Sequence, residues 1–184
     1  MIFEYKRLAK HNSYEYRNGK PIKRSLKSIR AIVIHYTSLS NDTAKNECDF
    51  FATGNTRFAG AHAFVDEKGL AGRSIYPTYT AWSVGDKANG RGAYFNMYNN
   101  HNTISIELCG IADREYITEK QKKKLKQLIR YYGKKCPNIE NIVRHFDITT
   151  KRCPAPYCGS MKNDAKWQEL RSELMLELKK VRAK

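Results

Sequence analysis

The apolar residues of this sequence form short runs and alternations that predict several β-strands. Residues 31–36 are an almost uninterrupted run of strand-forming residues, which is typical of a buried central strand. Residues 61–66 and 70–73 are separated by a glycine-containing turn, which predicts two consecutive strands. Residues 103–109 alternate apolar and polar side chains, and residues 141–146 predict another short strand.

Three other segments place apolar residues at helical spacing. The first runs from residue 43 to about residue 52, with Asn41 or Asp42 as its expected cap. The second covers residues 118–133 and begins with a Thr-x-x-Gln capping-box pattern. The third is an amphipathic helix that begins near residue 164. Strands that alternate with helices predict an α/β fold in which helices flank a mixed central sheet.

The first 30 residues differ from the rest in charge, with nine Lys or Arg residues against two Glu. Asn18-Gly19 is a strong signal for a two-residue β-hairpin. We therefore expect residues 1–30 to form a basic arm or hairpin packed on a single domain of residues 31–184. No internal repeat or linker is visible, and we expect no separate wall-binding domain.

Length and cysteine content restrict the class of protein further. A chain of 184 residues with 41% hydrophobic content is large enough for one core and has no apolar run that could span a bilayer. The N-terminus lacks the apolar segment of a secretory signal, so we expect synthesis in the cytoplasm. Five scattered cysteines suit a reducing compartment better than a disulfide framework.

The net charge of +16 predicts attraction to a polyanion, whether nucleic acid, an anionic membrane or an acidic wall polymer. Charge alone does not distinguish these partners. Because no helix-turn-helix, zinc-finger or ribonucleoprotein pattern is present, we expect no nucleic-acid partner.

Two histidines and one cysteine stand where they could hold a metal ion. His35 and His145 are expected at strand ends, and Cys153 follows in a loop stiffened by prolines. Three such ligands with an open fourth position are typical of catalytic Zn²⁺. Cys158 as a fourth ligand would instead make a structural site, and a cysteine–histidine nucleophile is the other possibility for this stretch.

An open zinc site favours hydrolysis of an amide, which also needs a proton acceptor and a cation near the developing oxyanion. Glu107 and Lys151 are the candidates. Both residues also have non-catalytic explanations. A glutamate on a strand is usually solvated, and Lys151 is one of 34 basic residues.

Five segments of the chain occur in the order found in one family. The chain resembles the zinc-dependent N-acetylmuramoyl-L-alanine amidases, which include amidase-type phage lysozymes and peptidoglycan recognition proteins. The matching segments are residues 32–37, 61–66 with Gly69, 81–82, 105–108 and 144–154. The last is the most specific, because it combines a His-x₇-Cys-Pro spacing with a lysine two residues before the cysteine.

The resemblance implies a role for each of these candidates. His35, His145 and Cys153 correspond to the three ligands of one catalytic Zn²⁺. Glu107 corresponds to the carboxylate that orients or deprotonates the attacking water. Lys151 corresponds to the cation that steadies the tetrahedral intermediate.

Other positions correspond less closely to the family. His62 and Trp82 are expected to contact substrate beside the metal, and Asp147 to order the loop. Some relatives carry a catalytic tyrosine where this chain has Ala61, and several carry a histidine where it has Ser83.

The resemblance therefore implies an enzyme that cleaves the amide between N-acetylmuramic acid and L-alanine in peptidoglycan. A phage or prophage endolysin that acts on the wall after release is the expected setting, with a cytoplasmic muropeptide-recycling amidase as the alternative. A non-catalytic peptidoglycan-binding protein is the other alternative, which the retained Cys153 disfavours. We expect a monomer whose basic charge attracts it to an anionic wall or membrane surface.

Overall fold

The computed structural model describes residues 1–85 and 90–183, and its centre is a six-stranded sheet in the order β1-β6-β5-β7-β4-β8. The pairing of β5 with β6 is antiparallel and the other pairings are parallel. This confirms the expected α/β fold with a mixed sheet. The strands are β1 (Tyr5–Lys6), β4 (Ala31–Ser40), β5 (Ala63–Val65), β6 (Ala71–Arg73), β7 (Thr103–Gly110) and β8 (Asn141–Arg144).

Four α-helices accompany the sheet in the described part of the chain. They are α1 (Ala44–Asp49), α2 (Glu119–Lys135), α3 (Phe146–Thr149) and α4 (Met161–Arg182). A π-helical turn at Phe50–Gly54 extends α1. Short 3₁₀ helices occur at His11–Ser13, Leu26–Ser28, Asn100–Asn102 and Ala155–Tyr157. None of these helices is both long and apolar enough to cross a membrane.

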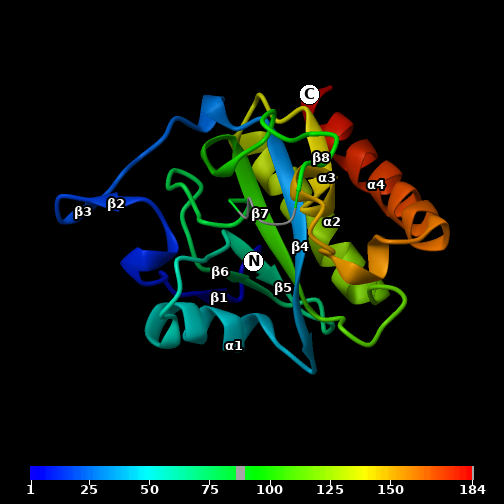
Figure 1. Cartoon of the computed structure of the whole chain (residues 1–184), viewed down its shortest axis with the longest axis horizontal. Coiled ribbons are helices and arrows are strands. Elements are labelled where there is room, and N and C mark those ends of the chain that lie inside the picture. The colour runs from blue at the N-terminus through cyan, green and yellow to red at the C-terminus, as the bar shows by residue number, and fades with distance from the viewer. Residues whose placement is uncertain (86–89, 184) are drawn as a thin grey trace.

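One face of the sheet is covered by α2 and α4, which lie next to each other (Figure 1). Ile34 of β4 and Ile106 of β7 point to this face, where they pack with Leu128 of α2 and Leu174 of α4 in the largest core cluster. Because side chains alternate along a strand, the neighbouring residues of β4 and β7 point to the other face.

The other face carries two smaller apolar clusters. One places α1 against Phe64 and Cys109, and the second joins Val33 to Val84 and Ile148. His35 and Glu107 belong to neither cluster. Both side chains therefore lie on this face of the sheet but outside its two apolar clusters.

Several boundaries differ from the sequence expectations for identifiable reasons. Thr43, not Asn41 or Asp42, caps α1 by accepting the backbone N–H of Asn46. Ser160 likewise caps α4, which begins at Met161, earlier than expected. The spacing of apolar residues locates a helix, but these ends depend on which hydroxyl meets the free N–H groups.

Only half of the expected capping box at α2 is formed. The Thr118 hydroxyl accepts the Gln121 N–H at 3.1 Å, as the pattern predicts. The Gln121 amide instead donates to the carbonyls of Val65 and Cys109, at 2.8 and 3.1 Å. This buried side chain therefore ties α2 to the ends of β5 and β7.

The N-terminal 30 residues contribute to the sheet as well as to its surface. β1 pairs with the edge strand β6, and Asn18-Gly19 joins the hairpin strands β2 (Tyr16–Arg17) and β3 (Lys20–Pro21) with both residues at positive φ. Isolated bridges connect Tyr14 with Ala81 and Lys23 with Tyr79. The arm is thus held against the loop that leads to Trp82.

Candidate metal centre and active-site groove

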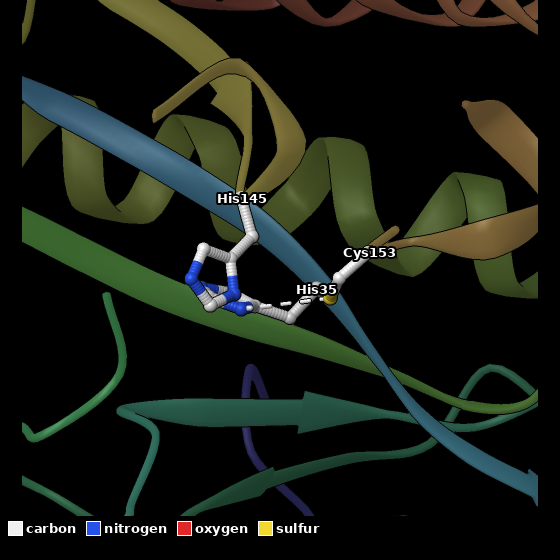
Figure 2. Close-up of side chains that lie close together, drawn as sticks. All are labelled: His35, His145 and Cys153. Atoms are coloured by element: carbon white, nitrogen blue, oxygen red, sulfur yellow. Dashed lines mark hydrogen bonds between the residues drawn. The ribbon is translucent and has the colours of Figure 1, made fainter. Parts of the chain in front are cut away.

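Three side chains from distant parts of the chain meet on the face of the sheet opposite α2 and α4. Potential ligand atoms of His35, His145 and Cys153 lie within 4.8 Å of one another, and all three residues are buried. Cys153 Sγ is 3.8 Å from His35 Nδ1, and the two imidazole centroids are 4.8 Å apart (Figure 2). The structure therefore brings together the three residues that the sequence nominated as ligands.

Backbone hydrogen bonds position these residues. β4 continues to Ser40, so His35 lies within the strand and not at its end as expected. His145 follows β8 directly, and its N–H donates to the Ile34 carbonyl at 3.2 Å. The Phe146 N–H then donates to the Cys153 carbonyl at 2.9 Å. One imidazole is thus fixed by a strand, and the loop carrying the thiol is tied to the other.

An ion-pair network centred on the buried Arg144 holds this loop in place. The Arg144 guanidinium contacts Asp147 Oδ1 at 2.6 Å and Asp164 Oδ1 at 2.5 Å. Asp147 Oδ2 also accepts the Arg144 backbone N–H at 2.8 Å. Asp147 therefore orders the turn between β8 and the cysteine loop, in agreement with the expected loop-ordering role.

The protonation of the site suits a metal ligand set. Burial, and then the neighbouring His145, Lys151 and His62, hold the pKa of His35 well below its usual range, so its imidazole is neutral. Burial raises the pKa of the Cys153 thiol, with Glu107 as the next cause. A bound divalent cation would reverse this shift by stabilising the thiolate.

The donor atoms fit a zinc ion by chemistry and by spacing. Zn–S and Zn–N bonds of about 2.3 and 2.0 Å at a tetrahedral angle would place sulfur roughly 3.5 Å from nitrogen. The observed separation of 3.8 Å is close to this value. His35 Nε2 is buried and has no hydrogen-bond partner among the described residues, so these residues do not complete the polar contacts of the ring.

Glu107 is the strand neighbour of His35. The two residues are partners in the parallel register of β4 and β7, so their side chains lie side by side on one face. Removal from water raises the pKa of Glu107 to about 7, against the lowering effect of Lys151 and with a further rise from Asp42. Its Oε2 atom is buried and finds no hydrogen-bond partner in the part of the chain that the structure describes. Glu107 is therefore placed as a carboxylate available to accept a proton.

The metal-ligand cluster forms part of the floor of a groove of about 510 Å³. Lys151 is exposed on the rim of this groove and interacts electrostatically with both Glu107 and Cys153. Its ammonium has no hydrogen bond or ion pair within residues 1–85 and 90–183, so it can meet a negative charge that develops above the floor.

The two residues expected to contact substrate, Trp82 and His62, differ in their position relative to the groove. Trp82 lines the groove together with Ser83. His62 is 1% exposed and is absent from the groove lining. Its Nδ1 accepts the Ser105 N–H at 3.0 Å, and its Nε2 lies 3.1 Å from the Tyr79 carbonyl and 2.9 Å from the Arg24 guanidinium. The structure places His62 beneath the site, where it links β7 to the N-terminal arm.

Cys158 does not complete a four-ligand site. Its thiol donates to the Pro154 carbonyl at 3.2 Å and stands outside the group that could hold a metal. Within residues 1–85 and 90–183 the group thus has three candidate ligands and no fourth, which is the ligand set typical of a catalytic centre and not of a closed structural one.

Tyr36, Glu47 and Arg57 are among the polar groove residues that the sequence reasoning missed. Tyr36 follows a ligand directly and was visible only as the end of an apolar run. Glu47 and Arg57 reach the groove through the packing of α1 and of the loop after it. No local sequence pattern marks them. The sequence of residues 77–101, a polar and aromatic mixture with several glycines, predicts a long loop of the kind that often lines a binding groove. Residues 86–89 of this loop lie outside the described residues.

The fold is α/β with a mixed sheet, and one groove gathers two imidazoles, a thiol, a carboxylate and a lysine. This combination defines a candidate metal-dependent hydrolase. A family profile described as N-acetylmuramoyl-L-alanine amidase matches residues 25–156. The chain belongs to this family, and the resemblance found in the sequence is confirmed.

Similar proteins agree with this placement. The chain is 31% identical over 140 residues to the N-acetylmuramoyl-L-alanine amidase CwlL of Bacillus licheniformis, which covers 72% of this chain and 38% of that protein. It therefore spans well under half of that curated relative. The solved structure of PlyL superposes with a TM-score of 0.67 at 23% identity and covers 92% of this chain and 95% of PlyL. The endolysin amidase LysCS from Clostridium intestinale gives a TM-score of 0.59 at 20% identity, with 94% and 96% covered.

Proposed function

We propose that this protein hydrolyses the amide bond between the lactyl group of N-acetylmuramic acid and L-alanine in bacterial peptidoglycan. The observation that carries the proposal is the meeting of His35, His145 and Cys153 with Glu107 and Lys151 in one groove, in a chain of the amidase family. In this proposal the first three residues hold one Zn²⁺.

The remaining residues then supply the proton transfers and the charge stabilisation. When bound, zinc supplies Lewis acidity that polarises the amide carbonyl and activates water for attack. Glu107 accepts the proton of the attacking water and delivers it to the departing amine of L-alanine. Lys151 stabilises the negative charge that develops on the carbonyl oxygen. Ala61 stands where some relatives carry a catalytic tyrosine. Among the described residues, Tyr36 is the tyrosine that lines the groove.

Removing and restoring the metal tests the proposal directly. We expect the protein to release new L-alanine amino termini from purified peptidoglycan without releasing new reducing sugars. A chelator should abolish this release because the carbonyl would lose its Lewis acid, and added zinc should restore it. Amino-terminal analysis of one preparation before chelation, after chelation and after zinc addition measures all three states.

Other products would point to other functions. Internal amino termini of the stem peptide would identify an endopeptidase. Binding of peptidoglycan with no cleavage at any zinc concentration would identify a non-catalytic recognition protein. Either result would contradict the proposed reaction.

We further propose that the net charge of +16 draws the protein to an anionic wall surface. The Debye length falls from about 10 Å at 0.1 M salt to about 3 Å at 1 M, so binding to sacculi should weaken steeply over this range. Co-sedimentation with sacculi measures the effect. Turnover of a small soluble muropeptide is the control and should change far less, because it needs no long-range attraction. Equal binding at both ionic strengths would rule out this use of the charge.

The setting that we propose is a phage or prophage endolysin that acts on the wall from outside the cytoplasm. The similarity to LysCS, which is named an endolysin amidase, supports this setting. Activity on intact sacculi is expected. Activity restricted to soluble muropeptides would instead identify a recycling amidase.

A further inference from the structure

A small pocket opens at the edge of the sheet, separate from the groove that holds the candidate metal ligands. Its volume is about 160 Å³, and it is lined by Lys6, Arg7, Leu8, Arg73, Ser74 and Tyr76. None of these residues lines the groove. Because pockets for drug-sized ligands usually measure about 300–1,000 Å³, this volume suits a small ion or one group of a larger molecule.

The pocket forms where two parallel strands end. β1 is the edge strand of the sheet, pairs with β6 and lies beside α1 (Figure 1). The register partners Lys6 and Arg73 are the last residues of these two strands. Beyond them, the Arg7 N–H donates to the Arg73 carbonyl at 3.1 Å, and the Ala9 N–H donates to the Ser74 carbonyl at 2.9 Å. The backbone on both sides of the pocket is therefore held by hydrogen bonds before any ligand arrives.

Arg73 is the cation of the pocket whose position is best defined. Its Cζ atom lies 4.5 Å from the centroid of the Tyr76 ring and 5.9 Å from that of the Phe3 ring. Such contacts orient the guanidinium plane and leave its N–H edge available. No hydrogen bond or ion pair engages this guanidinium within residues 1–85 and 90–183. Its planar pair of donors matches two oxygens of a phosphate group.

The pocket stays positively charged after its ion pair is taken into account. Arg7 Nη1 contacts Asp49 Oδ1 at 2.5 Å, but Asp49 Oδ2 also binds Lys45 Nζ at 2.6 Å. One carboxylate is thus shared between two cations. Lys6 is exposed and has no carboxylate partner in the described part of the chain. The side chains around this small volume therefore attract an anion.

Ser74 supplies a polar group that the described residues do not use. Ser74 is 1% exposed, its N–H donates to the His62 carbonyl at 3.1 Å, and its carbonyl accepts from Ala9. Its hydroxyl is buried and finds no hydrogen-bond partner among the described residues, which is a costly state for a polar group. Rotation about its single side-chain torsion can turn the hydroxyl toward a ligand in the pocket. This unused donor distinguishes the pocket from a generally basic surface.

We propose that this pocket binds the phosphate group of a phosphate ester, with Arg73 and Ser74 as donors and Lys6 and Arg7 as flanking charges. A phosphate offers three acceptor oxygens and up to two negative charges, which suits several cations and a hydroxyl better than a carboxylate does. Leu8 and Tyr76 line the same pocket and are 44% and 40% exposed, so they can contact the organic part of the ester. A soluble ester and a lipid headgroup present the same group.

Titration of the full chain with glycerol phosphate, followed by backbone amide chemical shifts, tests the site. We expect saturable shifts at the pocket residues that chloride at matched ionic strength does not produce. Ser74→Ala should weaken the affinity about 10-fold, because it removes one hydrogen bond to a charged ligand and no charge. Ser172→Ala is the matched control, since Ser172 is exposed on α4 and is absent from the pocket lining. Shifts that do not saturate, shifts confined to the groove, or equal affinities of the two variants would overturn the proposal.

Charge variants separate the pocket from the net charge of the chain. Arg73→Ala should weaken the affinity by more than about 10-fold, and Arg73→Lys should recover only part of the loss, because an ammonium lacks the planar pair of donors. Lys123→Ala removes the same charge from an exposed position on α2 outside the pocket. Thermal unfolding checks the fold of each variant, and the Ser74→Ala comparison stands even where Arg73→Ala does not fold. Equal affinities of Arg73→Ala and Lys123→Ala would refute a defined site.

Vesicles then identify the source of the phosphate. Co-sedimentation with phosphatidylglycerol vesicles is compared with phosphatidylcholine vesicles, which carry no net charge. A loss of vesicle binding in Ser74→Ala that matches its loss of glycerol phosphate affinity would support the pocket and identify a lipid headgroup. Unchanged vesicle binding beside a weakened glycerol phosphate affinity would support the pocket and identify a soluble ester. None of these measurements involves cleavage of peptidoglycan, so their failure would leave the proposed reaction untouched.

Discussion

Replacement of Glu107 by alanine is expected to lower kcat by about 10²- to 10⁴-fold while zinc still binds, because under the proposed function the variant loses its proton acceptor and keeps all three candidate metal ligands. Glu107 is the register partner of His35 and contributes no atom to the His35–His145–Cys153 group. Metal content by elemental analysis and turnover of a soluble muropeptide measure the two properties in the same preparation.

Two further variants make this prediction specific. Glu107→Gln keeps the size of the side chain but replaces the carboxylate with an amide, and it should be nearly as inactive as Glu107→Ala. Glu140→Gln is the control, because Glu140 is an exposed glutamate paired with Arg30 and is absent from the groove lining. Near-normal turnover in Glu107→Ala would remove Glu107 from the proposed chemistry. Loss of zinc from that variant would make it a contributor to metal binding.

The protonation of Glu107 supports the expected size of this effect. The pKa of about 7 means that the carboxyl is partly protonated in the protein without a metal. A divalent cation held by the neighbouring ligands would lower this pKa by direct attraction and so favour the carboxylate. A bound metal would therefore favour the carboxylate form of Glu107 as well as polarise the carbonyl, and removal of either the metal or Glu107 should remove most of the rate.

The site depends on the order of the strands in the sheet, and this order limits how much of the site can be predicted from the sequence. The runs that form β4, β7 and β8 were recognised from apolar periodicity, and the residues His35, Glu107 and His145 were nominated from them. Their closeness depends on β4 pairing with both β7 and β8. Parallel pairing joins segments that are far apart in the sequence, and no local pattern specifies it. For this part of the site, resemblance to a family supplied what periodicity could not.

The walls of the groove were less predictable than its floor. Arg57 is held by Asn12, Asn55 and the residues around them, which belong to two loops more than 40 positions apart. Each bond joins a side-chain amide to a backbone group, and such pairs leave no periodic trace in the sequence. The same holds for Gln121, whose capping-box pattern was recognised but whose amide was taken up by two strand carbonyls.

The N-terminal arm shows a similar limit. Its Asn-Gly hairpin was predicted because two positive φ angles are needed within two residues. Its connection to the groove was not predicted, since β1 is only two residues long and Asn12 and Ser13 belong to a single 3₁₀ turn, too short to give a periodic pattern. A basic segment that looked like a general electrostatic feature is, in the structure, a support for one wall of the site.

Replacement of Cys153 by serine is expected to weaken zinc binding by more than about 100-fold. Changing a residue that only supports a metal ligand costs up to about 100-fold in affinity, and loss of a ligand itself should cost more. A thiolate is a strong zinc ligand, whereas a neutral hydroxyl is a poor one. The buried Cys153 thiol lies 3.8 Å from His35 Nδ1, and the change removes one of three ligands without altering the backbone. Competition with a chromogenic zinc chelator measures the affinity.

Cys158→Ser provides the matched control for this prediction. Cys158 lies five positions away in the same loop and is also buried, but its thiol bonds to the Pro154 carbonyl and stands outside the ligand group. A serine there can keep that hydrogen bond, so zinc affinity and turnover should stay near those of the wild-type protein. Equal losses in the two variants would mean that the loop as a whole is sensitive to substitution. Loss confined to Cys153→Ser, with activity partly recovered at high zinc concentration, would separate a metal ligand from a nucleophile, because excess metal cannot replace a missing nucleophilic thiol.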